Sequence, residues 1–358
     1  MKKLLSLILV VIIATTLLAG FASAEGTYKI GMLPKFKGEN YFDGCYVGAQ
    51  KAAEDLGIEL VYDGPNQSEA TNAKQVEILT GWMSQDFDAI VVSPCDAEGI
   101  APTLKQFQEK GVLVLTFDAD APADARSMYV NAATARDIGV ALVDVIANGL
   151  TENGFGADTP ARLALISGSG LDVNQNEWIL AMEAYLAETY PWITVNCDEV
   201  GYLGADIWTP GSDETAAQNA ANESIALSGD ATDGSQINAI IGTSSMSTPA
   251  LAAAWDAVAG EKPNVVITGL ATPMGIVDYI LDEDNPMDYG VLWDVNNLGY
   301  LAVEAAVAVL NGTLEVAEGT FASNLGEKEI VMAEDGGLEL LLGAALTFGP
   351  DNVENFNY

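Results

Sequence analysis

Short apolar runs and longer amphipathic stretches alternate along the chain from Tyr28 onward. Each apolar run ends in a Gly, Pro, Asp or Ser cluster, which is typical of the βαβ units that build parallel sheets. The first half of the chain is therefore predicted to form one doubly wound unit. In the first half the pattern predicts strands at 28–34, 58–64, 88–94, 112–118 and 127–131, and helices at 43–56, 69–84, 98–110 and 134–149.

The same alternation begins again after the polar stretch 151–161. A later amphipathic stretch, 298–312, ends at Gly312 as a helix should, and 326–342 predicts a strand followed by a short helix. Two similar α/β lobes that face each other would leave a cleft between them. The second lobe has predicted strands at 162–168, 194–200, 238–244, 264–270 and 288–294, and predicted helices at 174–189, 213–227, 247–258 and 274–282.

The N-terminus has a different pattern. Lys2 and Lys3 precede an apolar stretch that ends in Ala22-Ser23-Ala24, the small-residue cleavage pattern of a secretory signal peptide. We therefore expect residues 1–24 to be a cleaved signal peptide and the mature protein to be periplasmic or otherwise extracytoplasmic. Phe21 stands where a lipid-anchored protein would carry a cysteine, so we expect no lipid anchor.

Composition removes several classes of function. The chain has 51 acidic and 14 basic residues, a balance that repels nucleic acid and anionic membranes. It has no histidine, which excludes Ser-His-Asp and Cys-His catalysis and every His-ligated metal site. The three cysteines, Cys45, Cys95 and Cys197, are far apart and lack metal-ligand spacing. We expect no metal and no cofactor, whereas paired carboxylates leave a glycoside hydrolase open.

Two aspartates follow the buried strand predicted at 112–118. A Val/Leu-rich run without alternation is typical of a strand covered on both faces, and ligands bind at the carboxyl ends of such strands in open α/β sheets. Asp118 and Asp120 therefore stand where a ligand would bind. The alternative is that both aspartates cap a turn before Pro122.

Other candidates also follow predicted strands or begin predicted helices. Lys35 follows the first strand, and Tyr41 and Phe42 precede the first helix; aromatic rings can stack on the apolar face of a sugar. Asn174 and Gln175 carry amides that both donate to and accept from hydroxyls. In each case a structural role, as a solvated lysine, core aromatic or helix cap, stays open.

The strand predicted at 288–294 ends in an aromatic residue beside a carboxylate, Trp293 and Asp294. Such a pair can combine stacking on a sugar ring with hydrogen bonds from its hydroxyls, and a plain core tryptophan is the alternative. An enzyme would have to use Asp118 and Asp294 as its paired carboxylates. The competing hypothesis is therefore a secreted carbohydrate-active enzyme.

Several motifs resemble, in order and at matching spacing, those of the autoinducer-2-binding proteins of the Lsr type and of rhamnose- and ribose-type periplasmic sugar-binding proteins. The resemblance extends over essentially the whole mature chain. It implies the type I architecture, an α/β fold of two Rossmann-like lobes with parallel sheets joined by a three-strand hinge. The motifs are "PKFKG", "VYDGP", "LTFDAD", "NQNEW", "ATP" followed by "YGVLWDV", and "NFNY".

The resemblance also implies the lobe boundaries and the role. The first lobe would be 25–132 plus 296–326, and the second 133–295 plus 327–358. The protein would act as a monomer that closes on one small molecule and hands it to an ABC permease, with no catalysis of its own. A chemoreceptor or sensor kinase is a further possible partner. The implied pocket positions are Lys35, Tyr41, Phe42, Asp118, Gln175, Trp293 and Asp294, with Asp120 beside them.

Three positions depart from the autoinducer receptors that the chain resembles. Asn174 stands where they have an acid, and Thr243 and Ser245 stand where they have proline and alanine. These changes make the expected pocket more polar and less anionic. We therefore expect a neutral monosaccharide, a pentose or a deoxyhexose such as rhamnose, ahead of autoinducer-2.

Overall fold

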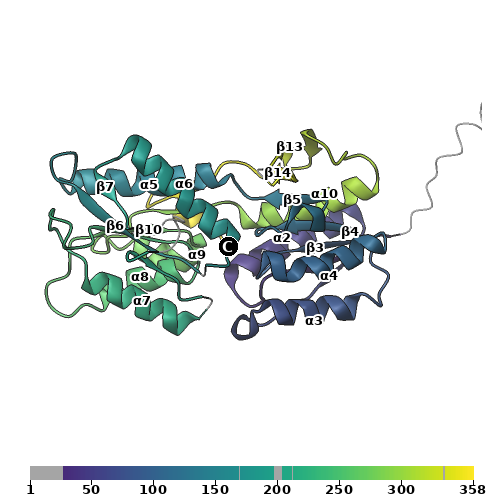
Figure 1. The fold of residues 1–358 in the computed structure, drawn as a ribbon, viewed down its shortest axis with the longest axis horizontal. Helices are drawn as coiled ribbons and strands as arrows, with labels where there is room; N and C mark the ends of the chain where they lie inside the picture. Colours follow the sequence, from purple (N-terminus) through teal and green to yellow (C-terminus); the bar gives the residue numbers. More distant parts are fainter. Residues whose placement is uncertain (1–26, 169, 197–203, 212, 334) are drawn as a thin grey trace, which may run out of the picture.

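The structure is a computed structural model that describes residues 27–168, 170–196, 204–211, 213–333 and 335–358. The predicted signal peptide, Cys197 and most of the strand predicted at 194–200 lie outside these residues. Figure 1 shows two lobes, each a sheet with helices packed against it, side by side along the longest axis. In the described part of the chain, no helix is both long and apolar enough to cross a membrane.

The first lobe contains an eight-stranded sheet in the order β12-β13-β14-β5-β4-β3-β1-β2. Its five N-terminal strands are parallel, as the uninterrupted apolar runs predicted, and β3 is buried at every position. The elements of this part are β1 (Lys29–Leu33), α2 (Asn40–Leu56), β2 (Glu59–Tyr62), α3 (Asn72–Trp82), β3 (Ala89–Val92), α4 (Ala97–Glu109), β4 (Leu113–Phe117) and β5 (Met128–Asn131).

The second lobe is built around a five-stranded sheet of order β10-β9-β6-β7, with β8 also paired to β6. A two-stranded sheet of β11 and β15 joins it through a bridge between Leu270 and Val291. The elements are α5 (Ala135–Glu152), β6 (Ala161–Ile166), α6 (Val173–Thr189), β7 (Ile193–Thr194), β8 (Ile207–Trp208), α7 (Glu214–Ala226), β9 (Ala239–Gly242), α8 (Ser247–Asp256), β10 (Val266–Gly269), α9 (Pro273–Ile280), β11 (Gly290–Leu292) and β15 (Leu346–Phe348).

Helix α10 (Val295–Leu310) returns the chain to the first lobe, where it packs on α2. The two helices approach closely because glycines face the contact. A Cβ on Gly48 would lie 1.7 Å from the carbonyl oxygen of Asn296, and one on Gly299 would lie 1.8 Å from that of Cys45. Any side chain at either position would push the helices apart.

The C-terminal part differs from the sequence prediction in two ways. The short helix predicted within 326–342 is the strand β14 (Leu338–Leu341), because pairing with β5 buries Leu340 in the sheet. Strands β12 (Gly319–Ser323) and β13 (Gly326–Met332) extend the same sheet. Strands β13 and β14 therefore pair within the first lobe, although 327–358 was predicted to belong to the second, and of the described C-terminal strands only β15 returns to the second lobe.

Three connections in the described residues run between the lobes: β5 to α5, β11 to α10, and β14 to β15. This architecture confirms the predicted α/β fold of type I with parallel sheets in two lobes. It also brings the carboxyl ends of β1, β4, β6 and β9 toward the space between the lobes.

Candidate functional site

A cavity of about 90 Å³ lies between the lobes, several times the volume that one water needs. Both lobes and the β11–α10 connection line it. Its residues are Lys35, Phe36, Glu39, Tyr41, Phe42 and Asp118 from the first lobe, Gly168, Asp172, Asn174, Gln175, Trp178, Gly211, Thr243, Ser244, Ser245, Met246, Leu270 and Leu292 from the second, and Trp293 from the connection.

Asp118 is buried at the mouth of β4 in a left-handed backbone conformation, with φ of 62°. The amide of Ala119 donates to the carbonyl of Phe117 over 2.7 Å, which closes a γ-turn around Asp118. Its carboxylate accepts hydrogen bonds from Tyr41 Oη at 2.7 Å and Ser93 Oγ at 2.6 Å. Strain at a non-glycine residue persists where surrounding contacts hold it, most often at functional sites.

Lys35 connects the two lobes electrostatically. Its Nζ lies 3.9 Å from Asp118 in the first lobe and 3.5 Å from Asp172 at the start of α6 in the second. Burial lowers the pKa of Lys35, but Asp172, Asp118 and Cys95 together raise it by more, so the net direction is upward. The lysine therefore stays charged and presents N–H donors to the cavity.

Aromatic rings form one wall of the cavity. Trp293, which is 3% exposed, donates from Nε1 to Tyr41 Oη over 3.0 Å. Its ring packs edge-to-face against Tyr41 at 6.0 Å and against Trp178 at 5.8 Å between centroids. Phe42 continues the wall at 5.0 Å from Tyr41. This wall offers apolar contact to one face of a bound molecule.

Side-chain amides face the cavity from α6. Gln175 Oε1 accepts from the Gly168 amide at 2.7 Å and from Thr243 Oγ1 at 2.6 Å, so Thr243 orients Gln175. Asn174 is 7% exposed, and its Oδ1 has no hydrogen-bond partner in the described part of the chain. Because buried acceptors are normally satisfied, this atom is expected to accept from a bound molecule or water.

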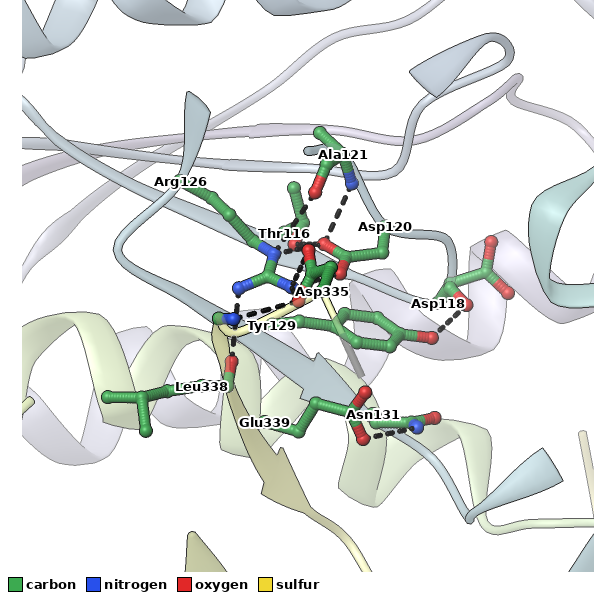
Figure 2. Close-up of polar contacts among 11 residues, drawn as sticks. Thr116, Asp118, Asp120, Ala121, Arg126, Tyr129, Asn131, Asp335, Leu338 and Glu339 are labelled. Atoms are coloured by element: carbon green, nitrogen blue, oxygen red, sulfur yellow. Dashed lines mark hydrogen bonds and ion pairs between the residues drawn. The ribbon is translucent and has the colours of Figure 1, made fainter. Parts of the chain in front are cut away.

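Nine of the predicted site residues line the cavity together: Lys35, Tyr41, Phe42, Asp118, Asn174, Gln175, Thr243, Ser245 and Trp293. Two do not. Asp120 is turned away by the chain reversal at Asp118 and is paired with Arg126, as Figure 2 shows. Asp294 caps α10, where it accepts from the Asn297 amide at 2.9 Å. The expectation that these two aspartates face a bound molecule is therefore corrected.

Several lining residues were not predicted from the sequence, among them Phe36, Glu39, Asp172 and Trp178. Trp178 had a usable signal, since it lies one helical turn after Asn174 on the same face of α6. Glu39 and Asp172 stand at helix N-caps, where an acid is so common that the position alone does not indicate a site.

Burial raises the pKa of Glu39 to about 7 from 4.5, although Ser245 of the other lobe and the Tyr41 amide lower it. Between these pH values the folded chain holds a proton that the unfolded chain has released, so the free energy of unfolding falls as pH rises. We expect Glu39→Gln, which stays neutral, to flatten this part of the pH dependence. Urea denaturation at pH 5.0, 6.0 and 7.5, about the window given by the two pKa values, measures it.

The matched control is Glu109→Gln at an exposed position of α4, which should leave the wild-type pH dependence in place. Parallel curves of unfolding free energy against pH for the wild type and Glu39→Gln would contradict the assignment of this proton to Glu39.

Comparisons with known proteins agree with this architecture. A family model described as a periplasmic binding protein domain matches residues 30–314. An ABC transporter solute-binding protein from Clostridium phytofermentas, solved with bound L-rhamnose, is 26% identical with a TM-score of 0.79, covering 92% of this chain and 98% of that chain. LsrB from Clostridium saccharobutylicum in complex with AI-2 is 24% identical with a TM-score of 0.80, covering 92% and 100%.

A third structure, an ABC transporter solute-binding protein from Burkholderia graminis in complex with D-arabinose, is 19% identical with a TM-score of 0.72, covering 94% of this chain and 100% of that chain. The matched family and these neighbours are solute-binding proteins, which confirms the prediction that the chain is not an enzyme. Because the family model matches well over half of the chain, this protein belongs to the periplasmic binding protein family.

Proposed function

We propose that this protein binds one small neutral sugar in the cavity between its lobes and delivers it, chemically unchanged, to an ABC permease. The observation that carries the proposal is the composition of the cavity wall: buried hydrogen-bonding groups on both lobes together with a row of aromatic rings. Sugar-binding sites need both, because a sugar has hydroxyls around its rim and an apolar face.

The charged groups of the cavity support a ligand without negative charge. Lys35 is matched by two carboxylates, Asp118 and Asp172, and Glu39 adds a third acid. An anionic sugar would therefore meet a net negative surface. Hydroxyls can instead donate to Asp118 and accept from Lys35.

The described contacts between the lobes support closure around the ligand. Besides Lys35 and Asp172, Gln67 of the first lobe donates to Glu214 of α7 at 3.2 Å. A molecule that touches both lobes stabilises this arrangement over an open one. The closed form is the state that a permease, or a chemoreceptor or sensor kinase, would recognise.

We further propose that the ligand is a pentose or a deoxyhexose such as L-rhamnose, ahead of autoinducer-2. Asn174 and Ser245 add hydrogen-bonding groups where the autoinducer receptors that the chain resembles have an acid and an alanine. Thr243 contributes less than the sequence analysis expected, since its hydroxyl is engaged by Gln175. The L-rhamnose and D-arabinose bound by two structural neighbours are of the proposed class.

Calorimetric titration against L-rhamnose, D-ribose, D-xylose, D-galactose and autoinducer-2 tests this ranking. We expect a neutral monosaccharide to bind most tightly, with one site per chain. If autoinducer-2 binds most tightly, the ranking is wrong although the role in sugar uptake stands.

We also propose that a signal peptidase removes residues 1–24 and that the mature protein is extracytoplasmic. N-terminal sequencing of the secreted protein tests this: the mature chain should begin at Glu25.

Asn174→Asp should shift the preference toward autoinducer-2. A carboxylate at this position restores the acid of the receptors that the chain resembles. Because a charged hydrogen bond is stronger than a neutral one, the ratio of the Kd for L-rhamnose to the Kd for autoinducer-2 should change by about fivefold to tenfold. The control is Asn222→Asp at an exposed position of α7, whose Oδ1 accepts from Gln218 at 3.2 Å and which does not line this cavity. An equal effect of Asn174→Asp on every ligand would mean that position 174 does not discriminate.

A further inference from the structure

We propose that the hairpin turn 335–337, together with Leu338 at the start of β14, is a positioning element for Asp118 and acts on it through Arg126 and Asp120. The inference rests on the proposed function in one respect, namely that Asp118 binds the sugar. Figure 2 shows the three parts together: the turn with Asp335 and Leu338, the Arg126 guanidinium, and the loop that carries Asp118 and Asp120.

Arg126 is the centre of this network. Its side chain is 1% exposed and lies between two segments that are far apart in sequence. Toward the loop it donates from Nε and Nη2 to the two carboxylate oxygens of Asp120, both at 2.5 Å. Toward the turn it donates to the Leu338 carbonyl at 3.3 Å and to Asp335 at 3.2 Å. The position of the guanidinium is therefore set jointly by the loop and the turn.

Asp120 has no freedom to follow a displaced Arg126 without moving its loop. The same carboxylate accepts from Thr116 Oγ1 at 2.6 Å and from the Ala121 amide at 2.7 Å. Thr116 belongs to β4, so Asp120 ties the loop back onto the strand that it leaves. A shift of Arg126 is thereby transmitted to the backbone directly after Asp118.

The backbone carbonyl of Asp118 is held by a residue of β5. Tyr129 donates from Oη to the backbone carbonyl of Asp118 at 2.7 Å, and Tyr129 is the register partner of Glu339 in β14. The γ-turn is thus fixed at the Asp118 carbonyl and at Asp120 by residues that contact the hairpin. Among the described residues, Asp118 is the one non-glycine residue with a positive φ. Its backbone is therefore expected to relax to a negative φ if these contacts are lost.

Gly337 shows how tightly the turn fits against Arg126. A Cβ at this position would lie 2.2 Å from Nη1 and 2.8 Å from the central guanidinium carbon. Gly337→Ala therefore displaces Arg126 without deleting any of the polar groups in the network. Its control is Gly81→Ala in α3, where an added Cβ meets nothing within 4 Å.

The experiment compares hydrogen exchange of the peptide 117–122 in the free protein, the Kd for L-rhamnose and the melting temperature. We expect Gly337→Ala to accelerate exchange of the Ala119 amide, which donates within the γ-turn, about tenfold or more. The Kd should rise about fivefold to a hundredfold, the factor set by re-forming a left-handed residue before binding. Gly81→Ala should change neither the exchange of the Ala119 amide nor the Kd.

A second variant keeps the test decisive if Gly337→Ala lowers the yield of folded protein. Tyr129→Phe removes only the hydroxyl that holds the Asp118 carbonyl and should accelerate the same exchange by a smaller factor. Unchanged exchange at 117–122 in both folded variants would overturn the inference. Accelerated exchange without any L-rhamnose binding by the wild type would retain the positioning role and count against the proposed ligand instead.

Discussion

Asp118→Asn is expected to weaken sugar binding by about tenfold to a hundredfold, the effect of losing one charged hydrogen bond. Asparagine tolerates the left-handed backbone at this position and keeps the side-chain shape, so the substitution removes the charge with little change of the turn. Lys35 then retains only Asp172 as a close carboxylate in the described residues. Calorimetric titration of the best ligand of the panel gives the change in Kd.

The matched control is Asp294→Asn. This residue caps α10 and does not line the cavity, and asparagine caps helices as well as aspartate does. We expect its Kd to equal that of the wild type. If Asp118→Asn binds as tightly as the wild type, the site has been placed wrongly.

Asp120→Ala should destabilise the protein by about 3 to 5 kcal/mol, because it leaves the guanidinium of Arg126 buried without its closest carboxylate. Asp335, the other ion-pair partner of Arg126, is 41% exposed and lies farther away at 3.2 Å. Burial raises the pKa of Asp120, and the hydrogen bonds and charge of Arg126 lower it by less, so the net direction is upward. Urea denaturation at pH 7 measures the loss.

Asp124→Ala is the control from the same loop. Its carboxylate is 71% exposed and pairs with Lys105 at the surface, so its loss should cost no more than about 1 kcal/mol. Equal effects of Asp120→Ala and Asp124→Ala would show that the Arg126 pair contributes no more than a surface ion pair.

Strands β8, β12 and β15 were not predicted from the sequence. Strands β1 to β6 and β9 to β11 could be predicted, because most of them are runs of apolar residues. Segment 112–118 is an example, and β4 occupies it. The segment 338–342 is also apolar, yet its length and leucine content fit a short helix as well as a strand. Only the neighbouring strand β5, which is more than 200 residues earlier in the chain, decides between them.

The two aspartates after β4 show the limit of prediction for the site. Their position at a strand mouth correctly indicated a cavity, but it could not show that Asp118 lines the cavity whereas Asp120 does not. This difference arises from the positive φ at Asp118 and from the ion pair of Asp120 with Arg126, and neither can be predicted from a strand pattern. Long-range pairs such as Lys35 with Asp172 are hidden for the same reason, since they depend on how the lobes face each other.

One chain is proposed to hold one small sugar and to release it unchanged. Native mass spectrometry of the protein purified from its own host tests it directly, followed by denaturation and identification of the released molecule. We expect one neutral monosaccharide per chain, recovered intact after prolonged incubation at saturating concentration. Conversion of the sugar during incubation, or a protein that carries no sugar and binds none of the panel at millimolar concentration, would contradict it.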